Sequence, residues 1–471
     1  MNIFGERDSK LKVTSPIIHK ISEEILQGLS PFEIFSTIQD QTDYCFILDS
    51  VVGSDKLAEY SFIGFDPDLK IQVKDHCMKV IDINGDKLEE SRIEEPLDEI
   101  RKLIGPTTRI DDNISRFMGG AVGYISYDAI RYWENIPNRT VPNLDYPDID
   151  MAIYRDGLIF DHKLRNVFYF HTGKNRLDMV QELIKKKHAY SSSSYSEPKT
   201  NTTRDNYEDS ILTAKEYIAS GDIFQIVLSR RIDFKIDGEL TSFYKNLMEI
   251  NPSPYMYFLK MGKRNIIGSS PEMLVRVDNR KVETFPIAGT RPRVDDKVAN
   301  NRLTEELLAD PKDRAEHLML VDLARNDIGR ISNYATVKVP EFMNVHQYSH
   351  VQHIVSRVVG ELAEGYDSFD TLKAVFPAGT VSGAPKVRAM EIIDELETSR
   401  RGPYAGAIGY FSFNGNSDHA ITIRTLTVDS GSASIQVGAG IVADSVPENE
   451  WLETEQKVEG LFKALERSSS E

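Results

Sequence analysis

Segments that alternate apolar and polar residues recur in the first 184 residues, and they limit the fold more than any other feature of the sequence. Leu69–Val80 (LKIQVKDHCMKV) and Gly157–His171 (GLIFDHKLRNVFYFH) are two of them. A period of two residues is typical of strands that bury one face, as antiparallel strands commonly do. Because helices are interspersed without a regular strand–helix alternation, we predict an α+β fold.

The C-terminal part adds a predicted hairpin. Ala407–Phe413 and His419–Val428 are expected to be strands on either side of an NGNSD turn. A third strand, Ser432–Val437, is expected to run into a glycine-rich turn at Gly438–Gly440. The antiparallel pattern therefore continues to the end of the chain.

Three helices are predicted from capping residues and apolar spacing. One spans Tyr207–Ser220, and another spans Asp310–Asn326 with Asp310 as its N-cap. The last is expected to open at Ser445, with Pro447 in its first turn and a capping-box glutamate at Glu448. Its apolar stripe consists of Val458, Leu461, Phe462 and Leu465.

One polar, serine-rich segment divides the chain. Residues 185–206 (KKKHAYSSSSYSEPKTNTTRDN) contain few apolar side chains, which predicts an exposed linker or disordered loop. The boundaries that follow are an N-terminal region at 1–184 and a C-terminal region at 207–471.

Composition narrows the class of function. The formal net charge of −17 argues against nucleic acid or an anionic membrane as a general partner. No apolar run approaches the roughly 18 residues of a membrane span, and the N-terminus lacks the apolar centre of a secretory signal. Cys45 and Cys77 give neither a disulfide framework nor metal-ligand spacing, so we expect a cytoplasmic protein.

Two acidic residues lie on the predicted helix at 310–326. Asp313 and Glu316 are three residues apart, and the apolar residues around them predict a buried helix, where unpaired carboxylates are costly. A hard cation such as Mg²⁺ takes oxygen ligands and would remove that cost. Pairing with Arg314, Arg325 or Arg330 would also remove it, so both alternatives stay open.

The final helix carries a second acidic group. Glu450, Glu453 and Lys457 share one of its faces. Acidic residues near a helix N-terminus suit the helix dipole, and Glu453 with Lys457 could be an ordinary surface pair. From this segment alone, the surface pair is the simpler interpretation.

Several segments could bind an anion. Three of them are turns rich in small residues, which can present backbone N–H groups: GSSPEM (268–273), PAGTVSGAPK (377–386) and VGAG (437–440). A fourth, TFPIAGTRPRV (284–294), places Arg291 and Arg293 after a glycine turn. Arg424 lies on an apolar strand, where a salt bridge on a solvated face is the alternative role. His353 lies in a segment rich in valine and isoleucine, where a core histidine is the ordinary role.

Taken together, these segments resemble the chorismate-utilising enzymes, and among them most closely the anthranilate synthase large subunits (component I). The resemblance covers about half the chain and rests on motifs that occur in the family's order. They are GDIFQIVLSR (221–230), NPSPYMYF (251–258), GSSPEML (268–274), PIAGTRPR (286–293), DRAEHLMLVDLARND (313–327), HIVSRVVGEL (353–362), PAGTVSGAPK (377–386), RRGPYAGAIGYF (400–411), IRTL (423–426) and VGAGIVADSVPENEWLETEQK (437–457).

The resemblance implies large antiparallel sheets packed on each other with helices outside, and dependence on Mg²⁺. It implies that Glu316 and Glu453 are the direct metal ligands and that Asp313 and Glu450 lie close by. Chorismate, the implied substrate, carries two carboxylates. The residues implied to hold one of them are Gly438, Ala439, Gly440 and Lys457; those implied to hold the other are Tyr404 and Arg424.

The resemblance also implies the reaction: ammonia adds at C2 of chorismate, the C4 hydroxyl leaves, and pyruvate is expelled to give anthranilate. Glu272 is the implied acid, and His353 and Thr380 lie near the chemistry. The resemblance assigns no contact to Arg291 or Arg293.

Two positions separate this chain from other branches of the family. Many aminodeoxychorismate synthases have a nucleophilic lysine in PIKGT, where this chain has Ala288. Isochorismate and salicylate synthases use a lysine base where this chain has Gln225. A site without either lysine suits ammonia, the pattern of anthranilate synthases. Aminodeoxychorismate synthase component I remains the nearest alternative; isochorismate or salicylate synthase and a non-catalytic amino-acid sensor are further ones.

Two partners follow from the resemblance. Neither cysteine lies in a nucleophile turn, so ammonia from glutamine implies a separate glutamine amidotransferase subunit (component II). Tryptophan is the implied feedback inhibitor. The residues that correspond to the family's tryptophan pocket are Asp49, Ser50, Asn251, Pro254, Tyr255 and Met256. Asp49 replaces the usual glutamate and shortens the reach to a ligand ammonium.

Overall fold

A computed structural model describes residues 15–26, 28–50, 59–107, 115–141, 145–186, 188–347 and 351–470. Two large antiparallel sheets form its centre. Sheet 1 runs in the order β1 (Ile17–Ile21), β10 (Asn166–His171), β9 (Asp156–Asp161), β3 (Tyr60–Phe65), β2 (Tyr44–Asp49), β14 (Tyr255–Met261), β15 (Arg264–Ser270), β24 (Thr425–Asp429), β25 (Ser432–Ile441), β13 (Gln225–Gly238) and β11 (Ser193–Tyr195). Two short strands, β12 (Lys199–Thr200) and β21 (Gly383–Ala384), also pair with β13.

Sheet 2 has the order β18 (Ile287–Pro292), β20 (Val351–Glu361), β17 (Lys281–Thr284), β16 (Met273–Asp278), β23 (Ser417–Ile421), β22 (Ala407–Ser412), β7 (Gly120–Ile125), β8 (Ile149–Tyr154), β4 (Leu69–Lys74), β5 (Cys77–Asp82) and β6 (Lys87–Arg92). Strand β19 (Lys338–Gln347) pairs with β20. All the strand pairs within these two sheets are antiparallel. The α+β prediction is therefore confirmed.

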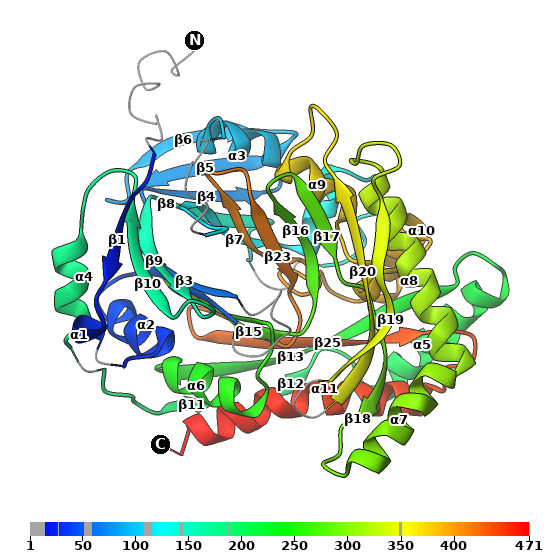
Figure 1. Cartoon of the computed structure of the whole chain (residues 1–471). Coiled ribbons are helices and arrows are strands. Elements are labelled where there is room, and N and C mark those ends of the chain that lie inside the picture. Colours follow the sequence, from blue (N-terminus) through cyan, green and yellow to red (C-terminus); the bar gives the residue numbers. More distant parts are fainter. Residues whose placement is uncertain are drawn as a thin grey trace.

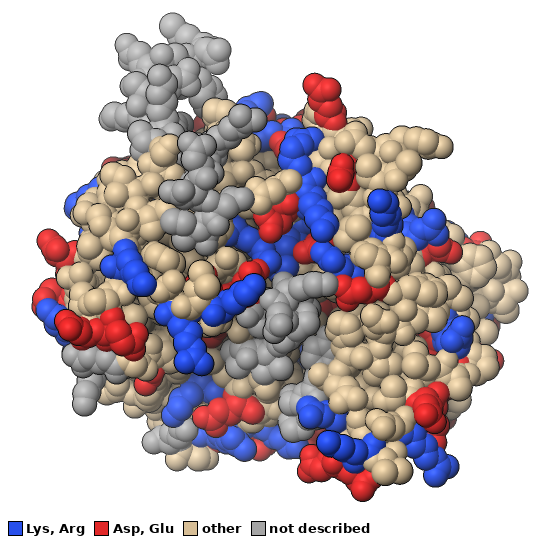
Figure 2. Space-filling model, viewed as in Figure 1, with Lys and Arg blue, Asp and Glu red and all other residues tan. Residues whose placement is uncertain are grey.

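The helices lie at the periphery of the sheets (Figure 1). They are α1 (Glu23–Leu26), α2 (Pro31–Gln39), α3 (Pro96–Ile104), α4 (Leu177–Ile184), α5 (Arg204–Ala219), α6 (Thr241–Ile250), α7 (Lys297–Ala309), α8 (Pro311–Gly329), α9 (Ser368–Val375), α10 (Lys386–Leu396) and α11 (Pro447–Ser468), with short 3₁₀ turns η2 (Tyr127–Tyr132) and η3 (Gly379–Val381). No helix in the described part of the chain is long and apolar enough to span a membrane. Basic and acidic side chains are interspersed on the face shown in Figure 2.

Both sheets combine strands from the two predicted regions of the chain. In sheet 1, β2 pairs with β3 on one side and with β14 on the other. In sheet 2, β22 pairs with β7 over six residues. Residues 1–184 and 207–471 therefore share one hydrogen-bonded framework.

Apolar side chains fill the layers on both faces of sheet 1. An aromatic cluster that includes Phe46, Tyr154, Tyr257 and Tyr410 packs between the sheets. The opposite face of sheet 1 is covered by apolar residues of α2, α6 and α11. Since each cluster takes alternate residues of the same strands, the period-two pattern of the sequence is explained.

Residues 185–206 are mostly exposed, and they follow the edge of sheet 1. Ser193–Tyr195 and Lys199–Thr200 form the strands β11 and β12, which pair with β13. His188 is an exception to the exposure, because its ring is only 4% exposed.

Four local predictions were wrong. The expected strand at His419–Val428 breaks, because β23 belongs to sheet 2 and β24 to sheet 1. The expected turn at Gly438–Gly440 lies inside β25. In GSSPEM the turn is limited to Pro271 and Glu272, because Gly268–Ser270 end β15 and Met273 begins β16. Helix α11 begins at Pro447 rather than Ser445, whose hydroxyl accepts a hydrogen bond from the Val442 N–H instead of capping the helix.

The fourth concerns helix α8, which is only half-buried. Its predicted N-cap is confirmed, because the Asp310 carboxylate accepts hydrogen bonds from the backbone of Lys312 and Asp313. One side carries the buried Leu320 and Val321, but Leu318 is 44% exposed on the other. The expectation of a helix buried on nearly every side was wrong, because sheet 2 covers one side alone.

Candidate active site

Acidic residues of α8 and α11 lie near one another, and we call the region between these helices and β25 the cleft. Burial raises the pKa of Glu316, and the nearby carboxylates of Asp313 and Glu453 raise it further. The Gln225 amide donates a 3.1 Å hydrogen bond to Glu316 and opposes this shift. Two helices far apart in the sequence therefore present carboxylates to the same space.

Glu450 and Lys457 complete the α11 side of the cleft. Burial raises the pKa of Glu450, and the Glu453 carboxylate adds to the shift. Lys457 lies 2.6 Å from Glu453 and also donates a 2.8 Å hydrogen bond to the Gly438 carbonyl. This lysine thereby fixes α11 against β25.

The acids in the cleft fit a hard divalent cation. Their donor atoms are carboxylate oxygens, which Mg²⁺ prefers. Among the described residues, neither Glu316 nor Glu450 forms an ion pair. Two of the three arginines proposed as alternative partners bind elsewhere: Arg314 contacts the Leu308 carbonyl, and Arg325 pairs with Asp322. Asp313 pairs instead with Arg291, a residue to which the sequence assigned no contact.

Arg424 lies where the chain crosses from β23 in sheet 2 to β24 in sheet 1. Its φ of +52° is in the left-handed region that non-glycine residues rarely adopt, and such strain is common at functional sites. Burial lowers the pKa of Arg424. Its guanidinium makes no hydrogen bond or ion pair with any residue that the structure describes, so it is not a surface salt bridge. A partly buried cation without a charged partner suits an anionic ligand.

The small residues of β25 leave room beside β13. A Cβ atom at Gly438 would lie 2.7 Å from the Leu228 carbonyl oxygen and 2.8 Å from the Tyr404 hydroxyl. One at Gly440 would lie 3.1 Å from the Gln225 amide nitrogen. Gly438, Ala439 and Gly440 therefore form a flat wall of the cleft, which Tyr404 and Gln225 approach closely.

Glu272 and Thr380, both predicted near the chemistry, are in direct contact. The Thr380 hydroxyl donates a 2.9 Å hydrogen bond to a carboxylate oxygen of Glu272. Burial raises the pKa of Glu272 to about 7, while Thr380 and then Lys457 oppose the shift. Near neutral pH a substantial fraction of Glu272 carries a proton, as a catalytic acid requires.

His353 lies on β20 and contacts the bulge of β18. Its Nδ1 is 2.8 Å from the Gly289 carbonyl oxygen and 3.1 Å from the Thr290 hydroxyl. Because a carbonyl only accepts hydrogen bonds, Nδ1 carries the proton and Nε2 is the basic nitrogen of the neutral ring. Burial lowers the pKa of His353, and the charge of the nearby Arg424 lowers it too.

The predicted regulatory residues gather at the junction of β2 and β14. Asp49 pairs with Met256 in the strand register, and the Ser50 hydroxyl donates to the Pro254 carbonyl at 2.9 Å. The side chain of Asp49 is held by the Ser61 hydroxyl and the Ser50 N–H. Four of the six residues line one pocket: Asp49, Ser50, Tyr255 and Met256. Asn251 lines another pocket, together with Arg424 and Lys457.

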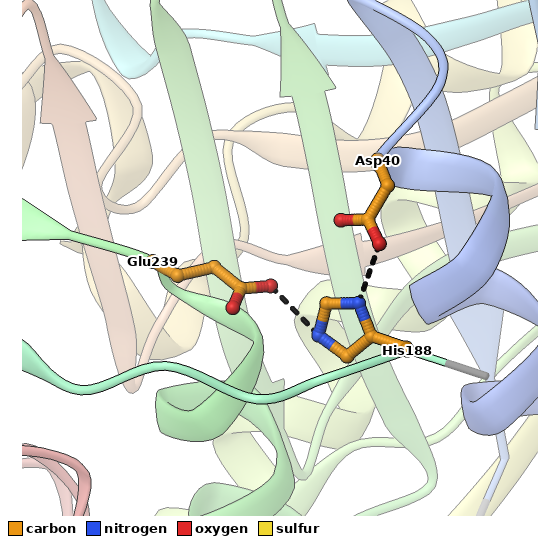
Figure 3. A group of neighbouring side chains, drawn as sticks. All are labelled: Asp40, His188 and Glu239. Carbon is orange, nitrogen blue, oxygen red and sulfur yellow. Dashed lines mark hydrogen bonds and ion pairs between the residues drawn. The ribbon is translucent and has the colours of Figure 1, made fainter.

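A second group of acidic residues surrounds His188, outside this cleft. The two nitrogens of its ring lie 2.7 Å from Asp40 and 2.9 Å from Glu239 (Figure 3). Asp40 approaches Nδ1 and Glu239 approaches Nε2, and the Thr241 hydroxyl also lies 3.2 Å from Nε2. Both ring nitrogens therefore already have polar partners, and we call this group the His188 bridge.

Comparison with known proteins identifies the family of this chain. The sequence profile of the chorismate binding enzymes matches residues 43–463. Anthranilate synthase component 1 of Methanothermobacter marburgensis is 45% identical over 454 residues, which cover 96% of this chain and 96% of that protein.

Solved structures of related proteins have the same fold as this chain. Anthranilate synthase component I from Streptococcus pneumoniae matches with a TM-score of 0.76 and 36% identity, over 86% of this chain and 92% of that one. The menaquinone-specific isochorismate synthase of Escherichia coli, at 18% identity, shares the fold, with a TM-score of 0.71 over 97% of each chain. The chain belongs to the chorismate binding enzyme family and, within it, to the anthranilate synthase component 1 proteins.

Proposed function

We propose that this chain converts chorismate and ammonia to anthranilate and pyruvate in a reaction that depends on Mg²⁺. The observation that carries the proposal is the convergence of the Glu316 and Glu453 carboxylates from two distant helices, beside a wall of small residues and an unpaired arginine. This arrangement suits an anion bound through a divalent cation.

Glu316 and Glu453 would hold Mg²⁺ directly, with Asp313 and Glu450 close by. Bound Mg²⁺ would neutralise the ring carboxylate of chorismate and make the ring more electrophilic. The amides of Gly438–Gly440 and the Lys457 ammonium would orient the same carboxylate. Arg424 and the Tyr404 hydroxyl would hold the enolpyruvyl carboxylate at the other end of the molecule.

Glu272 would act as the acid. In its protonated form it would donate a proton to the C4 hydroxyl as that group leaves and ammonia bonds to C2. Thr380 would keep the carboxyl group aimed at the leaving oxygen. His353 lies near Arg424, and we assign its ring to positioning the reacting groups.

The lack of a competing side-chain nucleophile favours anthranilate over other products. Ala288 is buried in β18 and has no amine to attack the ring. Gln225 donates to Glu316 and cannot act as a general base. Ammonia needs neither group, because it is already a nucleophile.

A separate glutamine amidotransferase subunit (component II) would supply ammonia, and tryptophan would inhibit through the β2–β14 junction. Cys45 and Cys77 are free, which suits the reducing cytoplasm. Alone, the chain is expected to use high concentrations of ammonium and not glutamine. Tryptophan is expected to inhibit this reaction and to raise the melting temperature.

The test is a product analysis. The purified chain is incubated with chorismate, ammonium chloride and MgCl₂, and the products are separated by mass. Anthranilate with an equal amount of pyruvate is the expected result. Accumulation of 4-amino-4-deoxychorismate or isochorismate would replace the proposal by one of the other activities of the family.

A further inference from the structure

Arg291 connects the bulge of β18 to the first turn of α8. Its guanidinium lies 3.0 Å from a carboxylate oxygen of Asp313 and donates a 3.1 Å hydrogen bond to Asp310. A third contact, at 2.9 Å, joins it to the carbonyl of Thr290. One side chain therefore binds both its own strand and two acidic residues at the N-terminal end of α8.

The backbone at this bulge packs directly on Asp313. The register of β18 shifts between Ala288 and Arg291, and Gly289 has a φ of +64°. A Cβ atom at Gly289 would lie 2.8 Å from Leu307 and 3.2 Å from the carboxyl carbon of Asp313. The glycine lets the strand approach the acid closely enough for the next side chains to reach it.

Asp313 keeps an oxygen available in spite of this pairing. Its Oδ2 is buried and accepts no hydrogen bond from a described residue, although Arg291 is only 3.0 Å away. The guanidinium therefore compensates the charge of the acid without being aligned with its lone pair. Asp310 takes the second arm of Arg291 while it caps α8 through the N–H groups of Lys312 and Asp313.

We propose that Arg291 is a positioning residue for the metal site and acts through Asp313. It holds the first turn of α8 against β18, points the carboxylate of Asp313 at the cleft, and offsets a negative charge next to Glu316. The inference rests on the proposed Mg²⁺-dependent function, because it concerns how the cation is held. Groups that orient metal-binding side chains commonly change metal affinity by about 10- to 100-fold.

Calorimetric titration with Mg²⁺ in the presence of chorismate tests this, using Arg291→Gln, Asp313→Asn and the double variant. We expect Arg291→Gln to weaken Mg²⁺ binding about tenfold. The KM for Mg²⁺ in anthranilate formation should rise by the same factor, while kcat at saturating Mg²⁺ changes less than about twofold. The double variant should bind Mg²⁺ like Asp313→Asn alone, because Arg291 has no effect without its partner.

Two further variants keep the test independent of folding. Arg302→Gln removes an exposed arginine that pairs with Glu306 on α7, and it should bind Mg²⁺ like the wild type. Asp310→Ser keeps a helix cap but removes the second partner of Arg291, and it should weaken binding less than Arg291→Gln.

Mg²⁺ affinity of Arg291→Gln equal to that of Arg302→Gln would overturn the inference, as would losses that add in the double variant. Both outcomes leave the proposed function intact as long as the wild type binds Mg²⁺. A wild type that binds no Mg²⁺ with chorismate present would overturn the proposed function, and the role of Arg291 with it.

Discussion

Two groups of carboxylates join distant parts of this chain, and their charges are compensated differently. In the cleft, Glu316 lies near Asp313 and Glu453, and these like charges raise its pKa beyond the effect of burial. Around His188, Asp40 and Glu239 approach the two nitrogens of one imidazole ring (Figure 3). The first group contains two acids without an ion pair among the described residues, Glu316 and Glu450, whereas both acids of the second group contact the same histidine.

The difference shows why acidic residues alone do not define a metal site. In the bridge around His188, each carboxylate already lies within contact of a ring nitrogen. The cleft is incomplete, because Lys457 and Arg291 compensate Glu453 and Asp313 but leave Glu316 and Glu450 unpaired. We therefore expect the proposed divalent cation in the cleft and not at the bridge.

The largest effect is expected from neutralising the acids of the cleft. Glu316→Gln or Glu453→Gln should lower kcat/KM with ammonium about 10³-fold, because several kcal/mol of metal-dependent stabilisation would be lost. Steady-state kinetics at several Mg²⁺ concentrations measure this. Asp322→Asn, at an exposed acid of α8 paired with Arg325, is the matched control and should be unchanged. Near-normal turnover in Glu316→Gln would mean that the cleft acids, like those of the His188 bridge, do not hold a catalytic metal ion.

The second-largest effect is expected at Glu272, the proposed catalytic acid. Glu272→Gln should lower kcat about 10²- to 10⁴-fold. In the wild type, kcat should fall as the pH rises above about 7, the pKa to which burial raises Glu272. Rates must be compared at constant free ammonia, because its concentration also rises with pH. A flat profile between pH 6 and 9 would contradict the acid role.

The same residue links pH to stability. The pKa of Glu272 is raised from 4.5 to about 7 in the folded protein, so its contribution to stability is full below pH 4.5 and is lost as the pH rises through about 7. Glutamine does not ionise, so Glu272→Gln should lose less stability than the wild type between these values. Urea unfolding at pH 5 and pH 8 compares the two proteins, and equal losses would contradict the burial of the charge.

A smaller effect is expected at Arg424, which is proposed to bind the substrate rather than the metal ion. Arg424→Gln should raise the KM for chorismate about 100-fold and leave Mg²⁺ binding without chorismate unchanged, because the arginine is proposed to bind the anion and not the cation. Initial rates against chorismate concentration give the KM. An unchanged KM would mean that this partly buried cation serves the fold instead.

The smallest effect is expected at the bridge. His188→Phe should cost about 1 kcal/mol of unfolding free energy, since both carboxylates reach solvent and surface ion pairs contribute little. Turnover with ammonium should stay the same, and EDTA should not change the difference in stability. Loss of activity in this variant would show that the bridge is part of the catalytic machinery.

The sequence predicted local elements well where local chemistry determines them. Asp310 and Pro311 begin α8 as expected, and the alternation in Leu69–Val80 produces the β4–β5 hairpin. The strand expected at His419–Val428 is divided between the sheets, because the crossing at Arg424 depends on partner strands that local alternation does not reveal. The Ser445 hydroxyl accepts a hydrogen bond from the Val442 N–H and does not cap α11, which the capping pattern alone does not reveal.

Less of the candidate site than of the fold could be predicted from the sequence. Helical spacing placed Asp313 with Glu316 and Glu450 with Glu453, but only the family resemblance brought the two pairs together. Arg291 was noted for its position after Gly289, and its contact with Asp313 depends on a strand bulge that spacing does not reveal. The bridge at His188 was missed because its segment is polar and serine-rich, which hid a buried ring among exposed neighbours.

The most direct test of the central claim uses Mn²⁺ in place of Mg²⁺, with chorismate present, and counts bound ions by electron paramagnetic resonance. We predict one Mn²⁺ per chain in the wild type and in His188→Phe, and none in either Glu316→Ala or Glu453→Ala at the same concentrations. Binding that survives both glutamate substitutions, or that disappears with His188→Phe alone, would contradict a cation held between α8 and α11.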